Sequence, residues 1–466
     1  MKAFSTKNGF LMVVFYVCFF ALITSNVSLN ACNTTDQPLD IRSATSINYK
    51  LDLITTWGGS NHDFGCDIAL DGSGNIYITG YTKSFGAGNY DAFIAKYDSS
   101  GKSLLNITWG TDKGDSGTKI ALDSSGNIYM VGETNSFGAG GSDAFIAKYD
   151  SSGKSLLNIT WGGRNSDFGK SFFLDDSGNI YITGDTNSFG AGNYDAFIAK
   201  YDSSGKSLLN ITWGGSNSDY GTGIALDVAG NIYITGRTTS FGVGDENAFI
   251  AKYDSSGNSL LNITYGGSNI DRGLDIALDD TENIYITGES NSFGVGNFDA
   301  FISKYDTSGK SLLNITWGGT GYDFGKSFFL DDSGNIYITG YTTSFGAGNY
   351  DAFIAKFDSS GKSLLNITWG GSNSDYGTGI VLDDAGNIYI TGRTNSFGAG
   401  NYDAFIAKYN APYSGIVFLD SNDDDDNDDD DDGESVPFGN FYLIFSLLAI
   451  IALVIIYKRK MNTNKR

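Results

Sequence analysis

Residues 75–110 read NIYITGYTKSFGAGNYDAFIAKYDSSGKSLLNITWG, and close copies of this stretch return every 52 residues along the chain. The segment SLLNIT begins at residues 103, 155, 207, 259, 311 and 363, and the AFIAKYD-like segment begins at Ala92 and at six later positions with the same spacing. The seven copies align without an insertion or a deletion. A fixed period of this length predicts a repeat architecture, because each unit can bury its apolar face only against its neighbours.

Each unit alternates apolar and polar residues with a period of two, which is typical of strands. In the first complete copy, DIALD (67–71) and NIYITGYT (75–82) flank the tight turn GSG. AFIAKYD (92–98) and SLLNITWG (103–110) flank a second tight turn, SSGK. The longer loops KSFGAGNYD and GTDKGDS connect these hairpins. We therefore expect four short antiparallel strands, named A to D in chain order, in every unit.

Seven four-stranded units predict an all-β fold, a single seven-bladed β-propeller over residues 48–412. Solenoid coils would be much shorter than 52 residues, and tandem sandwich domains would be longer. The last copy ends with strand C (404–410), whereas an orphan KLDLITTWG (50–58) resembling strand D precedes the first copy. We expect this N-terminal strand to complete the seventh blade and close the ring, which removes two exposed sheet edges. The alternative is that YSGIVFLD (413–420) fills that place.

One unit, residues 213–264, reads WGGSNSDYGTGIALDVAGNIYITGRTTSFG, a loop, and then NAFIAKYDSSGNSLLNIT. It resembles the SBBP family of β-propeller repeats, which share a GG-S-x-x-D-x-G start, a D-x-x-G-N-x-Y-(I/V)-T-G strand pair and an AF(I/V)AK third strand. The resemblance extends over about residues 48–410 and implies a propeller of the prokaryotic cell-surface type. It implies no defined activity, because the family is named for its fold. The chain departs from many family units by lacking a Pro-rich insertion between strands B and C.

Both ends of the chain predict a relation to a membrane. Residues 1–31 combine lysines, an apolar run and small polar residues, the layout of a secretory signal peptide, and residues 32–47 form a linker. Residues 438–457 carry no charge and are long enough to span a bilayer core of ~30 Å. The basic tail, residues 458–466, should remain in the cytoplasm. We expect a cell-surface protein with an extracellular N-terminal domain and one C-terminal transmembrane helix.

The net charge of −23 argues against nucleic acid as a partner, because phosphate recognition needs clustered Lys and Arg. Eleven of the 53 acidic residues lie in residues 413–437, which we interpret as a self-repelling acidic linker with loose calcium binding as a secondary role. No cofactor is expected. The three cysteines, Cys18, Cys32 and Cys66, predict neither a zinc site nor a disulfide framework. A Cys32–Cys66 disulfide and lipidation of Cys32 remain open.

One aspartate recurs just before strand A in every unit. A ring of carboxylates could hold a cation or a polar ligand near the channel mouth; the favoured interpretation is that each Asp accepts backbone N–H bonds in its loop, as Asp does in turns. The turn DDSGN (175–179) lacks the D-x-D-x-D-G spacing of a calcium loop and is interpreted as a hairpin turn. The seven recurring aspartates are Asp63, Asp115, Asp167, Asp219, Asp271, Asp323 and Asp375.

The copies disagree most clearly at the residue after ITG or MVG, near the end of strand B. Strand A also varies, with Lys170 and Lys326 among its first residues, and Arg272 adds charge in a D–A loop. These positions should lie toward the face with the longer loops, where a rigid scaffold usually carries its binding residues. Relaxed constraint at solvated positions is the equal alternative. The candidate ligand face consists of Tyr81, Glu133, Asp185, Arg237, Glu289, Tyr341 and Arg393.

The outermost strand carries the N-glycosylation acceptor NIT in six copies. The motif predicts either glycans around the rim or simply a good strand sequence. A single histidine, His62, has no thiol, metal cluster or triad partner, and we expect it to be an ordinary surface residue. The six candidate glycosylation residues are Asn106, Asn158, Asn210, Asn262, Asn314 and Asn366.

These features predict a membrane-anchored extracellular β-propeller that is not an enzyme. It would bind a cell-envelope glycan or protein through its long-loop face, in adhesion or recognition. The alternative is a structural or spacer protein of the envelope without a specific ligand. An extracellular hydrolase or lyase is the third interpretation.

Overall fold

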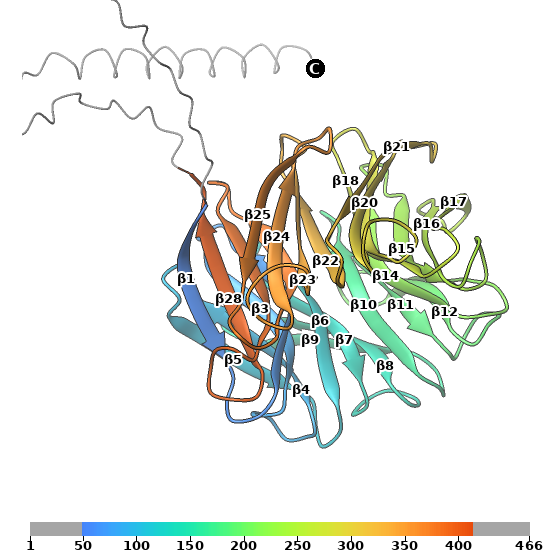
Figure 1. Cartoon of the computed structure of the whole chain (residues 1–466). Helices are drawn as coiled ribbons and strands as arrows, with labels where there is room; N and C mark the ends of the chain where they lie inside the picture. The colour runs from blue at the N-terminus through green and yellow to red at the C-terminus, as the bar shows by residue number, and fades with distance from the viewer. Residues whose placement is uncertain (1–48, 413–466) are drawn as a thin grey trace, which may run out of the picture. The chain divides into compact units, whose positions relative to one another are not determined.

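The computed structural model describes residues 49–412, which form seven four-stranded antiparallel sheets arranged around a central axis (Figure 1). Blades 1 to 6 are β2–β5, β6–β9, β10–β13, β14–β17, β18–β21 and β22–β25, and blade 7 consists of β26–β28 with β1. The seven-bladed propeller that the sequence predicts is therefore confirmed.

The four strands of each blade recur at the same positions of the repeat. The innermost strands, A, are β2 (Asp63–Leu70), β6 (Asp115–Leu122), β10 (Asp167–Leu174), β14 (Asp219–Leu226), β18 (Asp271–Leu278), β22 (Asp323–Leu330) and β26 (Asp375–Leu382). The B strands are β3 (Ile76–Thr82), β7 (Ile128–Thr134), β11 (Ile180–Thr186), β15 (Ile232–Thr238), β19 (Ile284–Ser290), β23 (Ile336–Thr342) and β27 (Ile388–Thr394). The C strands are β4 (Asp91–Tyr97), β8 (Asp143–Tyr149), β12 (Asp195–Tyr201), β16 (Asn247–Tyr253), β20 (Asp299–Tyr305), β24 (Asp351–Phe357) and β28 (Asp403–Asn410). The outermost strands, D, are β5 (Ser103–Trp109), β9 (Ser155–Trp161), β13 (Ser207–Trp213), β17 (Ser259–Tyr265), β21 (Ser311–Trp317), β25 (Ser363–Trp369) and β1 (Lys50–Trp57).

The ring closes through the N-terminal strand. Strand β1 pairs antiparallel with β28, with Trp57 opposite Ala404 and Lys50 opposite Asn410. The same antiparallel pairing joins strands C and D in the other blades, so Trp57 keeps the register of the repeat. The prediction that the first strand completes the seventh blade is confirmed.

Strand A is longer than its sequence pattern predicts. It begins at Asp63 in blade 1, not at Asp67, because the register shifts between Gly65 and Asp67 in a β-bulge. One extra residue in the bulge interrupts the alternation of period two, and the pattern therefore fails to show the first half of the strand. The recurring aspartates are thus the first residues of the A strands, and Arg272 lies in β18 and not in a loop.

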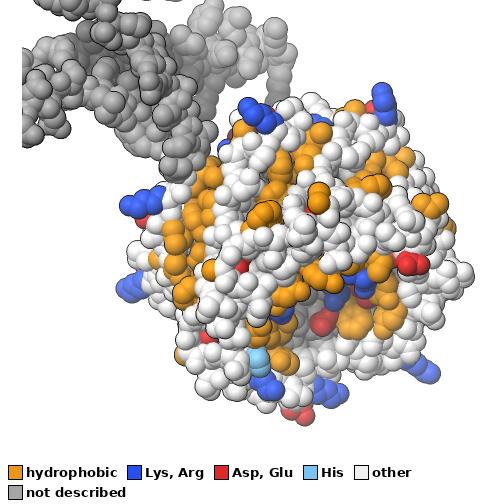
Figure 2. All heavy atoms as spheres, in the orientation of Figure 1, with side chains coloured by type: hydrophobic (Ala, Val, Ile, Leu, Met, Phe, Trp, Pro, Cys, Tyr) orange, Lys and Arg blue, Asp and Glu red, His pale blue; other side chains and the backbone are white. Residues whose placement is uncertain are grey.

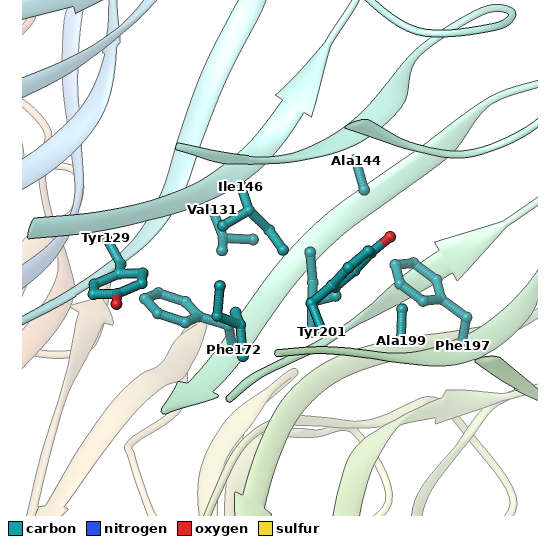
Figure 3. Close-up of a cluster of buried hydrophobic side chains, with 10 residues drawn as sticks. Tyr129, Val131, Ala144, Ile146, Phe172, Phe197, Ala199 and Tyr201 are labelled. Atoms are coloured by element: carbon teal, nitrogen blue, oxygen red, sulfur yellow. The ribbon is translucent and has the colours of Figure 1, made fainter. Parts of the chain in front are cut away.

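The hydrophobic core is divided into seven clusters, each shared by two adjacent blades. Figure 3 shows the cluster between blades 2 and 3, where Tyr129 and Ile146 of one blade face Phe172, Phe197 and Tyr201 of the next. Burial of each large side chain contributes about 1.5–3 kcal/mol relative to its exposure. No blade could bury this surface by itself, which explains why the ring forms as one unit.

Two glycine positions show how closely the strands approach one another. At Gly80, after the threonine of ITG, an added Cβ would lie 1.8 Å from the carbonyl oxygen of Phe64, so only glycine fits there. The A–B turns use a glycine with positive φ, such as Gly74 at 76°. In blade 5 Glu282 adopts this conformation, with φ of 61°, and is the departure from the repeat in that turn.

Several predicted segments lie outside the described residues. These are the signal peptide (1–31), the linker (32–47), the acidic linker (413–437), the transmembrane helix (438–457) and the basic tail (458–466). Within residues 49–412, no helix is long and apolar enough to cross a membrane.

Candidate functional site

The longer loops of all blades lie at one end of the ring, which we call the long-loop mouth. Short bridges join the ends of four B–C loops to the D–A loop of the next blade, for example His62 with Tyr402 and Glu246 with Ile270. Figure 2 shows hydrophobic, basic and acidic side chains gathered in a hollow of the face in view. The seven candidate ligand residues lie at this end, each opposite the second residue of its strand A, as Tyr81 is opposite Phe64.

The recurring aspartates are structural. Asp63 is fully buried, and its carboxylate accepts hydrogen bonds from the Thr82 hydroxyl, from Ser84 Oγ (2.6 Å) and from the Gly59 amide (2.8 Å). Equivalent bonds recur in the other blades. The carboxylate therefore ties the D–A loop to the B–C loop of its own blade, and the interpretation of these residues as loop-stabilising acceptors is confirmed. Among residues 49–412, no group of three or more acidic, histidine or cysteine side chains is arranged to hold a metal ion.

The A–B turns are closed by their aspartates in the same way. Asp175 accepts hydrogen bonds from the Ser177 amide (3.0 Å) and the Asn179 amide (2.8 Å), and its second oxygen accepts from Tyr181 Oη (3.2 Å). These donors hold the pKa of Asp175 below its ordinary value although its burial acts in the opposite direction. The hairpin-turn interpretation of DDSGN is confirmed.

One part of the mouth is a chain of alternating charges, which we call the charged sector. Glu246 pairs with Arg237 (3.2 Å) and with Arg272 (2.7 Å). Arg272 also pairs with Glu289 (2.7 Å), and Glu289 pairs with Lys326 (3.2 Å). Burial acts to raise the pKa of Glu289, but Lys326 and Arg272 outweigh it and hold the pKa below its ordinary value. Each cation of this chain therefore already has a carboxylate partner.

The charged sector continues into blades 2 and 3. Lys170 pairs with Glu133 at 2.9 Å, and Asp185 lies near both. Burial raises the pKa of Asp185 to about 6, and the Glu133 charge adds to this, whereas Lys170 acts in the opposite direction. The pKa of Lys170 is raised, because the two carboxylates outweigh the effect of its burial. Asp185 is thus a carboxyl group that is poorly compensated at neutral pH.

The other part of the mouth, formed by blades 6, 7 and 1, is aromatic, and we call it the aromatic sector. The Arg393 guanidinium lies 4.2 Å from the ring centre of Tyr376, 4.9 Å from that of Phe64 and 5.4 Å from that of Tyr402. Cation–π contacts of this kind are favourable but leave the charge without a counter-ion. Among residues 49–412, no carboxylate lies within ion-pair distance of Arg393, and its Nε is buried without a hydrogen-bond partner.

Further rings extend the aromatic sector on both sides of Arg393. Tyr81 lies 4.7 Å from Phe64 and 5.3 Å from Tyr90, and Tyr376 lies 4.8 Å from Tyr341 and 5.2 Å from Tyr350, all between ring centres. These rings are neither fully buried nor fully exposed. Three of the candidate ligand residues, Tyr81, Tyr341 and Arg393, therefore lie together in this sector.

Four residues of the mouth are not among those predicted from the sequence: Phe64, Glu246, Tyr376 and Tyr402. They occupy the second residue of strand A and the residue before strand C, which also differ between copies. Both positions are aromatic in blades 1, 3, 6 and 7, whereas blades 4 and 5 each carry one charged residue there, and this contrast is the signal that could have revealed them.

Below the mouth, a charged brace crosses the channel. Lys119 Nζ lies 3.5 Å from Asp67 and 3.9 Å from Asp275, although Asp275 belongs to a distant blade. The pKa of Lys119 is raised, because the carboxylates outweigh its burial, and burial raises the pKa of Asp67. Burial also raises the pKa of the neighbouring Cys66 thiol to about 12, and Cys66 forms no disulfide within the described residues. These ion pairs and the protonated, unreactive thiol favour a structural role for the residues that line the channel.

At the rim, the candidate glycosylation residues are exposed and also link adjacent blades. Trp161 Nε1 donates to Asn210 Oδ1 at 2.8 Å across the boundary between blades 2 and 3, and four other boundaries show the same bond. At the boundary between blades 4 and 5, Tyr265 takes the place of the tryptophan, and Asn314 Oδ1 accepts a hydrogen bond from Ser303 Oγ of its own blade (2.8 Å). The asparagine of NIT thus has a structural role that the sequence did not reveal, and its glycosylation stays a prediction.

The SBBP β-propeller repeat matches residues 53–86, 104–138, 157–190, 209–242, 316–346 and 365–398. Each match begins in a strand D and ends in the following B–C loop, and the structure contains seven blades of this design. The chain belongs to the SBBP family of β-propeller repeats. In this SBBP protein, the unit outside the matched residues is the one that carries Tyr265 and Glu282.

Relatives of the SBBP chain are similar over parts of their length. A regulatory protein, FlaEY, of Caulobacter vibrioides is 23% identical over 370 residues, which cover 63% of this chain and 38% of the relative. An uncharacterised WD repeat-containing protein of Acanthamoeba polyphaga mimivirus is 25% identical over 169 residues, 29% of this chain and 12% of that protein. The chain therefore spans well under half the length of either relative.

Among solved structures, the WD40 β-propeller domain of Doa1 aligns with a TM-score of 0.50 and 13% identity, covering 78% of this chain and 97% of that domain. At this identity the likeness concerns the fold alone.

Proposed function

We propose that this SBBP propeller is a non-catalytic binding protein whose partner, a glycan or a protein, docks at the long-loop mouth. The observation that carries the proposal is the contrast between the cations of the charged sector and Arg393. In the charged sector each cation is paired with a carboxylate, whereas Arg393 in the aromatic sector has none among the described residues. Partly exposed aromatic rings around an unpaired arginine are the residue types that dominate binding energy at interfaces.

The two arginines predicted as ligand residues therefore have different roles in the proposal. Arg237 Nε is paired with Glu246 at 3.2 Å and its guanidinium lies over Tyr220 at 4.1 Å, so it stabilises the ring. Arg393 has the same stacking on Tyr376 but no such acidic partner. A partner should depend on Arg393 and not on Arg237.

The proposed setting is the cell surface. The apolar segment 438–457 would anchor the chain, the acidic linker 413–437 would hold the propeller away from the membrane, and glycans on the six rim asparagines would cover its outer edge. The support for this setting is the sequence of the two ends and the exposure of the asparagines.

The test uses the full-length chain on a panel of glycans and envelope proteins, with and without calcium. Arg393→Gln and Arg237→Gln form a matched pair, since both remove one stacked guanidinium. We expect at least one saturable hit that Arg393→Gln weakens at least tenfold and Arg237→Gln leaves within about twofold. A folded chain without any hit would refute the proposal and favour the spacer interpretation, and equal losses in both variants would refute the division of the mouth.

A further inference from the structure

Two polar atoms without partners lie around the same two rings of the aromatic sector. His62 Nδ1 and Arg393 Nε are two of the three buried side-chain polar atoms that make no hydrogen bond in residues 49–412. The His62 ring is stacked 5.8 Å from Phe64 and 5.7 Å from Tyr402, and the Arg393 guanidinium lies 4.9 Å and 5.4 Å from these rings. A buried polar atom without a partner is costly, and natural proteins keep such atoms mainly at functional sites.

The repeat itself contains a comparison for Arg393. Arg237 occupies the equivalent position 156 residues earlier, and there the residue before strand C is Glu246, which forms ion pairs with Arg237 and with Arg272. In the aromatic sector, Tyr402 takes the place of Glu246 and Phe64 takes the place of Arg272. The carboxylate that the chain supplies to Arg237 is therefore missing at Arg393.

We infer that a ligand carboxylate binds at Arg393 and that the ligand is an acidic glycan, a polymer of uronic acids. This inference rests on the proposed function and names the ligand class of its site. Arg393 pairs with the carboxylate through its guanidinium group, since guanidinium and carboxylate form charge-assisted hydrogen bonds. The His62 ring lies beside Phe64 and Tyr402, and the neighbouring tyrosine rings offer apolar faces with hydroxyl groups at their edges.

The shape of the site favours a sugar over an acidic peptide. The aromatic sector holds partly exposed tyrosine and phenylalanine rings in blades 6, 7 and 1, and the C–H faces of pyranose rings can pack on such rings. A peptide anchored by apolar side chains would need pockets, and two cavities of about 350 and 430 Å³ lie elsewhere. The first is at the rim beside Trp213 and Phe241, and the second is among the short turns beside Asp175.

The decisive variant is Tyr402→Glu, which copies the arrangement of Glu246 into the aromatic sector and supplies Arg393 with an internal carboxylate. The full-length chain is titrated calorimetrically with oligogalacturonate and with the same oligomers after reduction of their carboxyl groups to alcohols. We expect saturable binding of oligogalacturonate, at least tenfold weaker binding of the reduced oligomers, and a loss of about ten- to hundredfold in Tyr402→Glu and in Arg393→Gln. Arg237→Gln serves as the control and should bind within about twofold of the unaltered chain.

The outcomes separate this inference from the proposed function. Equal binding of the reduced oligomers, or a Tyr402→Glu variant that still binds, would overturn the role of the carboxylate and leave the mouth as a neutral-glycan site. Stronger binding of poly-glutamate than of oligogalacturonate, dependent on Arg393, would overturn the sugar class. Binding of neither acid, with a hit elsewhere on the panel, would overturn the inference alone.

Tryptophan fluorescence shows whether Tyr402→Glu folds. If it does not, Arg393→Lys takes its place as the test, because it keeps the charge but loses the guanidinium geometry. We then expect a partial loss of oligogalacturonate binding, and unchanged binding would overturn the inference.

Discussion

Replacement of Asp185 by Asn should stabilise the protein at neutral pH. Asp185 is 5% exposed, and burial raises its pKa from 3.8 to about 6, so ionisation of this carboxyl group opposes folding. At ~1.4 kcal/mol for each pKa unit, the difference between these two pKa values corresponds to about 3 kcal/mol, which is an upper bound for the gain in the free energy of unfolding. The substitution removes a negative charge that stabilises the protonated Lys170, although Lys170 keeps its ion pair with Glu133. We expect a net gain of about 1–3 kcal/mol.

The stabilising effect of Asp185→Asn should depend on pH. Below pH ~4 the carboxyl group is protonated in both the folded and the unfolded chain, and the substitution should have little effect. Between pH ~4 and ~6 the unfolded chain ionises while the folded chain keeps its proton, so the contribution of Asp185 to stability falls as pH rises. Above pH ~6 the full difference between the variant and the unaltered protein should be present.

The equivalent residue two blades further on, Glu289, is the matched control with the opposite sign. Its pKa lies below the ordinary value because of Lys326 and Arg272, so its contribution to stability is present above pH ~4.5 and is lost as pH falls through the lowered pKa. Glu289→Gln should destabilise the neutral protein by about 3 kcal/mol, the usual cost of breaking a buried pair.

The assay for both variants is urea unfolding followed by tryptophan fluorescence at a series of pH values from 3.5 to 8. A shift of the Asp185→Asn midpoint to lower urea at pH 7.5, or the same shift at pH 3.5 as at pH 7.5, would refute the reasoning. A stabilising Glu289→Gln would show that burial outweighs the ion pairs at both positions.

Three further predictions concern the scaffold and the rim. Asp219→Ala should lower the stability by about 3 kcal/mol, seen as a lower urea midpoint, because three donors lose their buried acceptor. Trp161→Phe should cost about 1 kcal/mol through the lost bond to Asn210. Tyr265→Phe should remove no bond of this kind, because Asn314 accepts from Ser303 of its own blade, and equal midpoints in all three proteins would contradict the blade link. Peptide mass mapping of the protein from its own cells should find glycans on the exposed rim asparagines, and unmodified peptides at all six sites would show that NIT serves the fold alone.

Much of the fold could be predicted because the same strand and turn pattern occurs in seven copies. The 52-residue period, the tight turns and the tryptophan register of Trp57 together predict the blade count and the way the ring closes. The start of strand A at Asp63 could not be predicted, since the bulge after Gly65 interrupts the alternation on which the pattern depends. The link between Trp161 and Asn210 was hidden for another reason: the two residues are 49 positions apart and meet only across a blade boundary.

The sequence by itself determined the propeller, the role of the aspartates as local turn and loop acceptors, and the variable positions gathered at one end. These properties depend on contacts within one unit or on the number of units. The tertiary structure decided which of the variable residues interact. Arg237 and Arg393 follow the same motif in the sequence, but ring geometry places Glu246 and Arg272 around the first, and Tyr402 and Phe64 around the second. The sequence determines the charge of each side chain. Its counter-ion comes from a neighbouring strand or blade, which only the closed ring brings into contact with it.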